Sequence, residues 1–136
     1  MGHQFEPLSY KVFGACIAVQ RQVGPHCMEV DYQRALEIEF RKLGLEYIRE
    51  AEIPIIYDGI EVTRRRDFVI WDDTHTLLLE TKAAKAMNPE DVEQCQLYLR
   101  YGNFRVCLMA NFGQVPLAKD RFVWTPTGLA LYGPNL

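Results

Sequence analysis

The sequence predicts an α/β domain in which a central mixed β-sheet is flanked by helices. Two stretches with helical spacing of apolar residues come first, several strand-like segments follow, and a third helix separates these from two further strands. Leu77-Leu78-Leu79 is apolar without alternation, as expected of a strand that is covered on both faces. Helices packed on both sides of a sheet follow from this order.

Composition limits the class of protein. The chain has 136 residues, of which 49% are hydrophobic, so residues 1–136 are expected to form a single domain with a substantial core. A net charge of −3 argues against a protein that coats nucleic acid by bulk electrostatics, but it does not exclude a nuclease. No apolar run approaches a membrane span and no signal-peptide pattern is visible, so we expect a cytoplasmic location and no membrane partner. The four scattered cysteines are expected to be reduced thiols, mostly in the core.

Two helices are expected before the first strand. The first runs from an N-cap at Ser9 to about Gln22, and the second from Cys27 to Leu43, where Gly44 stops it. Glu29 lies on the same side of the second helix as its apolar residues and is therefore expected to point inward. An acid placed only to favour the helix dipole is the alternative. The residues at buried-face spacing in the second helix are Met28, Tyr32, Ala35, Leu36 and Leu43.

The next segment is expected to be extended. Leu45–Tyr57 reads as a strand that Pro54 places at an edge or a bulge, and Asp58-Gly59 is a tight turn that sets Ile55 opposite Val62. The run Arg64-Arg65-Arg66 then alternates across a strand. Either one or two of these arginines face a phosphate backbone, or they form a solvated edge.

The stretch from Arg66 to Lys82 reads as two apolar strands joined by the turn 72–75. A symmetric turn would pair Trp71 with Thr76, Val69 with Leu78, and Asp67 with Glu80. Opposed carboxylates repel, so this pair predicts a compensating cation, and hard oxygen ligands suit Mg²⁺ or Mn²⁺. Alternation puts Lys82 on the face of Glu80, where its ammonium could stabilise developing charge during phosphodiester hydrolysis.

A third helix should begin at Asn88-Pro89-Glu90-Asp91 and end near Gly102. Gln94 and Tyr98 lie one turn apart on it, where they could hydrogen-bond a ligand or simply face solvent. Phe104–Asn111 and Arg121–Trp124 are expected to be the last two strands.

These residues together resemble a known pattern. Asp67, then Glu80-Thr81-Lys82, then Gln94 and Tyr98 resemble the D…(E)-x-K…Q-x-x-x-Y pattern of the PD-(D/E)XK nuclease superfamily. Residues 24–32 are similar to the signature of its GxxExxY family, except that His26 replaces the first glycine, and Asn111-Phe112-Gly113 is similar to a late N-F-G segment of that family. The resemblance implies a restriction-endonuclease-like core.

The resemblance also implies roles. Asp67 and Glu80 would bind Mg²⁺ or Mn²⁺ with the Thr81 carbonyl, Glu29 would supply a further acid, and Lys82 would position the attacking water. Gln94 and Tyr98 would line the site. The implied substrate is nucleic acid, with DNA favoured, and a homodimer is the simplest way for so small a domain to cut both strands. A non-catalytic nucleic-acid- or partner-binding module with the nuclease fold, or an unrelated α/β domain with a chance acidic hairpin, are the alternatives.

Overall fold

The structure, a computed structural model, describes residues 6–101, 104–125 and 128–132. One six-stranded sheet runs in chain order from β1 to β6. β3 and β4 are parallel, and the other neighbouring strands are antiparallel. The elements are α1 (Glu6–Val23), α2 (Glu29–Lys42), β1 (Glu46–Tyr57), β2 (Ile60–Trp71), β3 (Thr76–Lys82), α3 (Pro89–Tyr101), β4 (Val106–Asn111), β5 (Ala118–Thr125) and β6 (Gly128–Tyr132).

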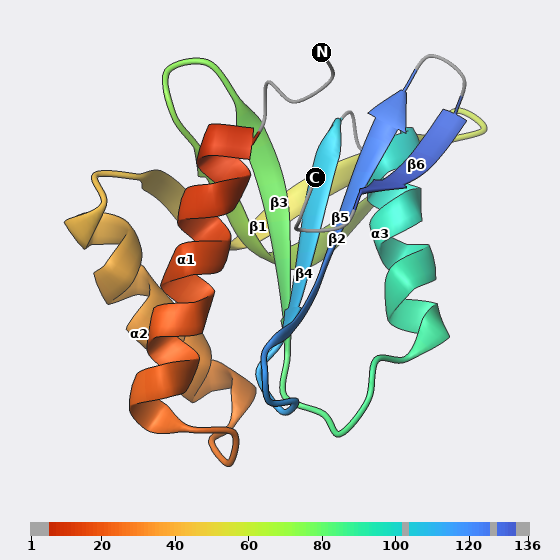
Figure 1. Ribbon diagram of the computed structural model, residues 1–136. Helices are drawn as coiled ribbons and strands as arrows, with labels where there is room; N and C mark the ends of the chain where they lie inside the picture. The colour runs from red at the N-terminus through yellow and green to blue at the C-terminus, as the bar shows by residue number, and fades with distance from the viewer. Residues whose placement is uncertain (1–5, 102–103, 126–127, 133–136) are drawn as a thin grey trace.

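Helices cover both faces of this sheet. α1 and α2 lie on one face and α3 on the other, with β3 and β4 in the middle (Figure 1). A parallel pair needs a crossover, and α3 supplies it between β3 and β4. The central strands are therefore buried on both sides, and Leu77, Leu78 and Leu79 are fully buried. The predicted mixed sheet flanked by helices is confirmed.

The two N-terminal helices differ from the prediction at their ends. Ser9 was expected to cap α1, but it lies inside this helix and is buried. Met28 and Leu43 were expected in the core, yet they are 70% and 43% exposed. They are the N-cap and C-cap of α2, so their side chains extend beyond the turns that pack on the sheet. Tyr32 and Leu36, in the middle of α2, are buried as expected.

Turn residues set the register of both hairpins. Asp58 and Gly59 have positive φ angles of 52° and 76°, as a two-residue hairpin loop requires, and Ile55 pairs with Val62. In the second hairpin the predicted register is confirmed for Trp71 with Thr76 and for Val69 with Leu78. The predicted start of α3 is also confirmed: the side-chain oxygen of Asn88 accepts the N–H of Glu90 at 2.9 Å. Gly102, its expected end, lies outside the described residues.

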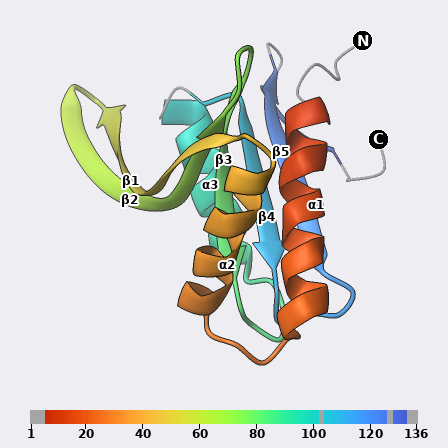
Figure 2. The ribbon, with the colours of Figure 1, turned by 90° about the vertical axis from the view of Figure 1, so that its left-hand side faces the viewer.

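Strands β1 and β2 are longer than the other strands of the sheet. Both strands have 12 residues, and their far halves curve away from α1 and α2 (Figure 2). Ala51, Ile53 and Ile55 of β1 join the buried cluster on the α3 side. We call the part of the β1–β2 hairpin from Ala51 to Arg66 the arm.

Within the described residues no helix is long and apolar enough to cross a bilayer.

Candidate active site

The regular β-ladder is interrupted on both sides of Asp67. Toward β3, backbone pairing ends at Phe68 with Leu79. Toward β1, pairing holds at Phe68 and Arg66 but skips the position between them, where Glu50 stands with a φ of 55°. A positive φ is uncommon for a residue with a side chain, so Glu50 marks a local distortion. Asp67 therefore lies at a position of β2 that has no regular ladder pair in β1 or in β3.

Both strands change faces at this interruption. Arg49 and Phe68 are paired and face α2, since Arg49 bonds Gln33 of α2 and Phe68 belongs to the core on that side. Ala51 and Arg66 are the pair two residues further, and regular alternation would keep them on the same face. Instead Ala51 packs on the α3 side and Arg66 stacks on Tyr98 of α3. Alternation therefore fails as a guide to Arg66.

Asp67 and Glu80 are held together through side chains. One Glu80 oxygen accepts the backbone N–H of Asp67 at 3.2 Å. One Asp67 oxygen accepts the backbone N–H of Thr81 at 2.7 Å and its hydroxyl at 3.0 Å. The Thr81 hydroxyl also accepts the amide of Gln33 at 2.8 Å. The expected backbone pair of Asp67 with Glu80 is not formed, because the ladder ends at Phe68 with Leu79; instead, each carboxylate accepts a backbone N–H of the opposite strand.

Glu80 is a buried carboxyl whose ionisation is unfavourable. Burial and, next, the charge of Asp67 raise its pKa to about 7, although the charges of Arg66 and Lys82 and the Asp67 N–H act in the opposite direction. Its side chain is only 9% exposed. Additional positive charge next to Glu80 would stabilise the ionised form of its carboxyl group.

Lys82 is fixed by α3. Its ammonium lies 3.2 Å from a carboxylate oxygen of Asp91, in the first turn of that helix. Burial lowers the pKa of Lys82, but the hydrogen bond and charge of Asp91, followed by the charges of Glu29 and Glu80, outweigh it and raise the pKa. Lys82 therefore remains a cation at the border of the acidic pair.

Glu29 lies at the edge of this group. Its side chain is exposed, so the expectation that it points into the interior is wrong. As the first residue of α2 it extends beyond the packed turns, like Met28 before it. It is still near the site: partial burial raises its pKa, Lys82 lowers it, and the charges of Asp67 and Asp91 raise it.

Gln94 and Tyr98 both contact Arg66. The guanidinium of Arg66 donates to Gln94 at 3.0 Å and lies 4.5 Å from the centre of the Tyr98 ring. The same nitrogen donates to Glu80 at 2.7 Å, which makes a buried ion pair. Gln94 is exposed and Tyr98 is buried, with a hydroxyl that has no hydrogen-bond partner among the described residues. These two residues of α3 thus reach the acidic pair through Arg66.

The donor set has the chemistry of a Mg²⁺ or Mn²⁺ site but not a complete ligand shell. The Asp67 and Glu80 carboxylates and the Thr81 carbonyl are hard oxygen ligands. Among the described residues, no three His, Cys, Asp or Glu side chains are grouped as a metal cluster. Arg66 holds one oxygen of Glu80 and Thr81 holds one oxygen of Asp67. The residues fit such an ion provided that these bonds rearrange.

The N-F-G segment supports the strand end that carries Lys82. The backbone carbonyl of Lys82 accepts the N–H of Phe112 at 2.8 Å. Asn111 accepts the N–H of Ala84 at 3.0 Å and donates to its carbonyl at 2.9 Å. Gly113 lies so close to Ala84 that an added Cβ would stand 2.7 Å from its nitrogen. This segment therefore fixes the loop that follows Lys82.

The aromatic residue of the GxxExxY-like segment has a similar supporting role. The Tyr32 ring stacks on Phe112 with centroids 4.4 Å apart. Its hydroxyl donates to the Gly24 carbonyl at 2.6 Å and accepts the N–H of Cys27 at 3.2 Å. Tyr32 thereby ties the loop before α2 to the segment that supports Lys82.

Three contributing residues were not anticipated: Arg66 as the partner of Glu80, Asp91 and Gln33. Only Asp91 had a signal that could have identified it, since an acid in the first turn of a helix next to a lysine-bearing strand is a candidate ion-pair partner. The contact between Gln33 and Thr81 joins residues 48 positions apart, which no local pattern reveals.

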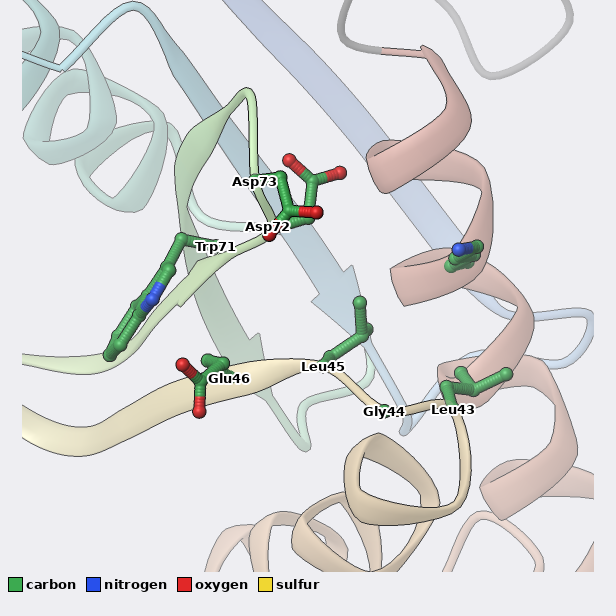
Figure 3. A pocket seen from close by; sticks show the side chains of 8 residues that line it. Leu43, Gly44, Leu45, Glu46, Trp71, Asp72 and Asp73 are labelled. Carbon is green, nitrogen blue, oxygen red and sulfur yellow. The ribbon is translucent and has the colours of Figure 1, made fainter.

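A separate cavity of about 300 Å³ lies where β2 ends, next to Trp71, Asp72 and Asp73. Figure 3 shows Leu45 and Glu46 of the chain entering β1 facing Trp71, Asp72 and Asp73 at the end of β2. None of the predicted site residues lines it. The candidate site is therefore not this cavity.

Comparison with known proteins identifies the family. A model of the PD-(D/E)XK nuclease superfamily matches residues 6–122, a range that contains every residue of the acidic group and of the segments that support it. Searches among curated proteins and among solved structures gave no significant match. The match covers most of the 136 residues, and the mixed sheet between helices agrees with it. The chain belongs to the PD-(D/E)XK nuclease superfamily.

Proposed function

We propose that this protein is a nuclease that hydrolyses phosphodiester bonds of nucleic acid, preferably DNA, with Mg²⁺ or Mn²⁺ as cofactor. The observation that carries the proposal is the meeting of Asp67 and Glu80 at the interruption of the ladder, with Lys82 beside them. Membership of a nuclease superfamily supports it. Two carboxylates and a fixed cation are the groups that metal-assisted attack on phosphorus requires.

Each residue has a proposed role. Asp67, Glu80 and the Thr81 carbonyl would hold the metal, which when bound polarises the scissile phosphate and activates water. Lys82 contributes a positive charge that stabilises the negative charge developing on the phosphate oxygens in the transition state. Glu29, exposed at the border of the site, is positioned to act as a further acid or an outer ligand.

Gln94 and Tyr98 are proposed to act on Arg66. Both contact its guanidinium, and their positions on α3 fix where that charge lies relative to Glu80. In this assignment they are positioning residues of the active site.

Three finer assignments belong to the same proposal. Contacts of Tyr32 with Phe112 and Gly24 support membership of the GxxExxY family, because residues of its two signature segments pack together. A homodimer is proposed for cleavage of duplex DNA, since the active site of one protomer cleaves one strand. A cytoplasmic location is proposed together with these two assignments.

A non-catalytic binding module is the second candidate function. The observation that favours it is the ion pair of Arg66 with Glu80 at 2.7 Å, which neutralises one of the two acids without a metal. A domain that keeps the fold but binds nucleic acid or a protein partner would have no need to open this pair.

A cleavage assay separates the two candidates. Purified protein is incubated with end-labelled single- and double-stranded DNA and RNA, with Mg²⁺, with Mn²⁺, and with EDTA. We expect metal-dependent cleavage of DNA that falls about a hundredfold in Lys82→Ala, the scale for loss of one electrostatic group. Lys85→Ala removes an exposed lysine three residues away and serves as the matched control. Binding without cleavage, unchanged in Lys82→Ala and Glu80→Gln, would establish the binding module.

A further inference from the structure

Arg66 contacts Glu80, Gln94 and Tyr98 of the candidate site. Its guanidinium donates to Glu80 and to Gln94 and stacks on Tyr98, and its Nε donates to the Arg65 carbonyl at 2.9 Å. Its side chain is 14% exposed. A guanidinium held on several sides in this way is part of the site.

Both oxygens of Glu80 already accept a hydrogen bond. One oxygen accepts the Asp67 N–H and the other accepts Arg66. A divalent ion that binds the remaining lone pair of either oxygen would lie close to the guanidinium and repel it. Metal and Arg66 compete for one carboxylate.

Arg66 would stay near the site after its bond to Glu80 is broken, because Gln94 and the Tyr98 ring still contact its guanidinium. A planar guanidinium matches the geometry of phosphate oxygens. We propose that Arg66 exchanges partners: it balances Glu80 in the metal-free protein, and it binds a phosphate oxygen of nucleic acid once a divalent ion takes Glu80. This inference rests on the proposed function, because it assumes that Glu80 binds metal.

The first experiment measures metal affinity without turnover. Isothermal titration of Mg²⁺ is compared in wild type, Arg66→Met and Arg66→Lys at pH 8 and pH 9. Removing a competing charge-assisted bond should tighten binding by about tenfold in Arg66→Met. Arg65→Met is the matched control, because Arg65 is exposed and pairs with Glu50 and Glu52 at 3.9 and 3.8 Å, away from Glu80. Equal or weaker Mg²⁺ binding in Arg66→Met would overturn the competition.

A measurement on the unmutated protein covers the case in which Arg66→Met does not fold. In arginine-labelled wild-type protein, the Nε–H signal of Arg66 should shift as Mg²⁺ is added, because the guanidinium leaves Glu80. The Arg41 signal should not move, since Arg41 lies over Tyr47 on the other side of the sheet. An unchanged Arg66 signal at saturating Mg²⁺ would refute the exchange.

The second half is tested by nucleic-acid binding. Affinity for a short DNA duplex is measured in the Lys82→Ala background, with and without Mg²⁺. Arg66→Met should weaken binding about tenfold with Mg²⁺ and leave it nearly unchanged without, whereas any effect of Arg65→Met should be the same in both. A loss independent of Mg²⁺ would contradict the exchange. If Mg²⁺ binds and displaces Arg66 but no nucleic acid is cleaved, the nuclease proposal fails while the exchange stands. If nucleic acid is cleaved but the Arg66 signal does not shift, the exchange fails while the nuclease proposal stands.

Discussion

Lys82 and Asp91 form an ion pair of 3.2 Å between the end of β3 and the first turn of α3. The side chains are 30% and 22% exposed, so solvent screens the pair and its contribution to folding is small. Its value is positional, because it holds the ammonium beside Glu80 and Glu29.

Loss of this pair should affect cleavage more than stability. Asp91→Asn should lower the cleavage rate about tenfold, as Lys82 loses its fixed position, with little change in melting temperature. In the Lys82→Ala background the same change should have no further effect, which single-turnover rates can measure. Glu90→Gln removes a neighbouring exposed acid and is the matched control. An effect of Asp91→Asn that persists without Lys82 would show that Asp91 acts by another route.

The metal-free protein should lose stability as pH rises through the range in which Glu80 ionises. Its pKa is raised from 4.5 to about 7, so the folded state holds this proton more tightly than the unfolded state does. The unfolding free energy should therefore fall between about pH 4.5 and 7, by roughly 3 kcal/mol from this group. Denaturant titrations across this range should show the slope in wild type and not in Glu80→Gln. Equal slopes in both would assign the effect to other groups.

Thr81→Val should destabilise the fold and disturb Asp67. The buried hydroxyl of Thr81 donates to Asp67 and accepts from Gln33, and its removal leaves both groups without that partner. We expect a loss of about 1–3 kcal/mol and slower cleavage. Thr81→Ser keeps the hydroxyl and should retain most of the activity. The measurement is a denaturant titration beside a cleavage assay, and equal activity in the two variants would mean that the hydroxyl does not position Asp67.

Gly113→Ala should displace the loop after Lys82. The new Cβ would stand 2.7 Å from the Ala84 nitrogen, so backbone has to move, at a cost of about 1–3 kcal/mol. Gly14→Ala provides the opposite control: apart from the backbone of α1 itself, no described residue lies within 4 Å of the added Cβ, and an alanine inside α1 should stabilise the protein by about 0.5–1 kcal/mol. Thermal unfolding of both variants checks this. Similar shifts for the two would contradict the close approach at Ala84.

The sequence predicts the parts of this fold that short-range rules control. Turn residues and alternating apolar positions give the register of Val69 with Leu78, and Asn88 gives the start of α3. β6 was not predicted, because Arg121–Trp124 was expected to be the last strand. Strands at a sheet edge depend on a neighbour that the local pattern does not contain.

For the candidate site, the sequence predicts which acids meet but not how. Period-two alternation assumes an unbroken strand, and the distortion at Glu50 violates this assumption where Asp67 lies opposite. Arg66 consequently faces α3 and bonds Glu80, a contact that alternation assigns to the wrong face. Gln33 was missed because its contact depends on how α2 packs.

The change of face at Glu50 and Asp67 divides the β1–β2 hairpin into two parts that are held differently. On one side, Arg49 and Phe68 are tied to the core under α2, and on the other the arm ends in exposed Ile56 and Ile60. Residues inserted or removed in equal numbers from both strands of the arm would change its reach but leave the frame at Asp67 unchanged. Loss of a single residue of β2 between the arm and Asp67 would instead shift the alternation, and Asp67 would exchange faces with its neighbour. The arm is thus a segment whose length can change while Asp67 keeps its place at the base of the hairpin.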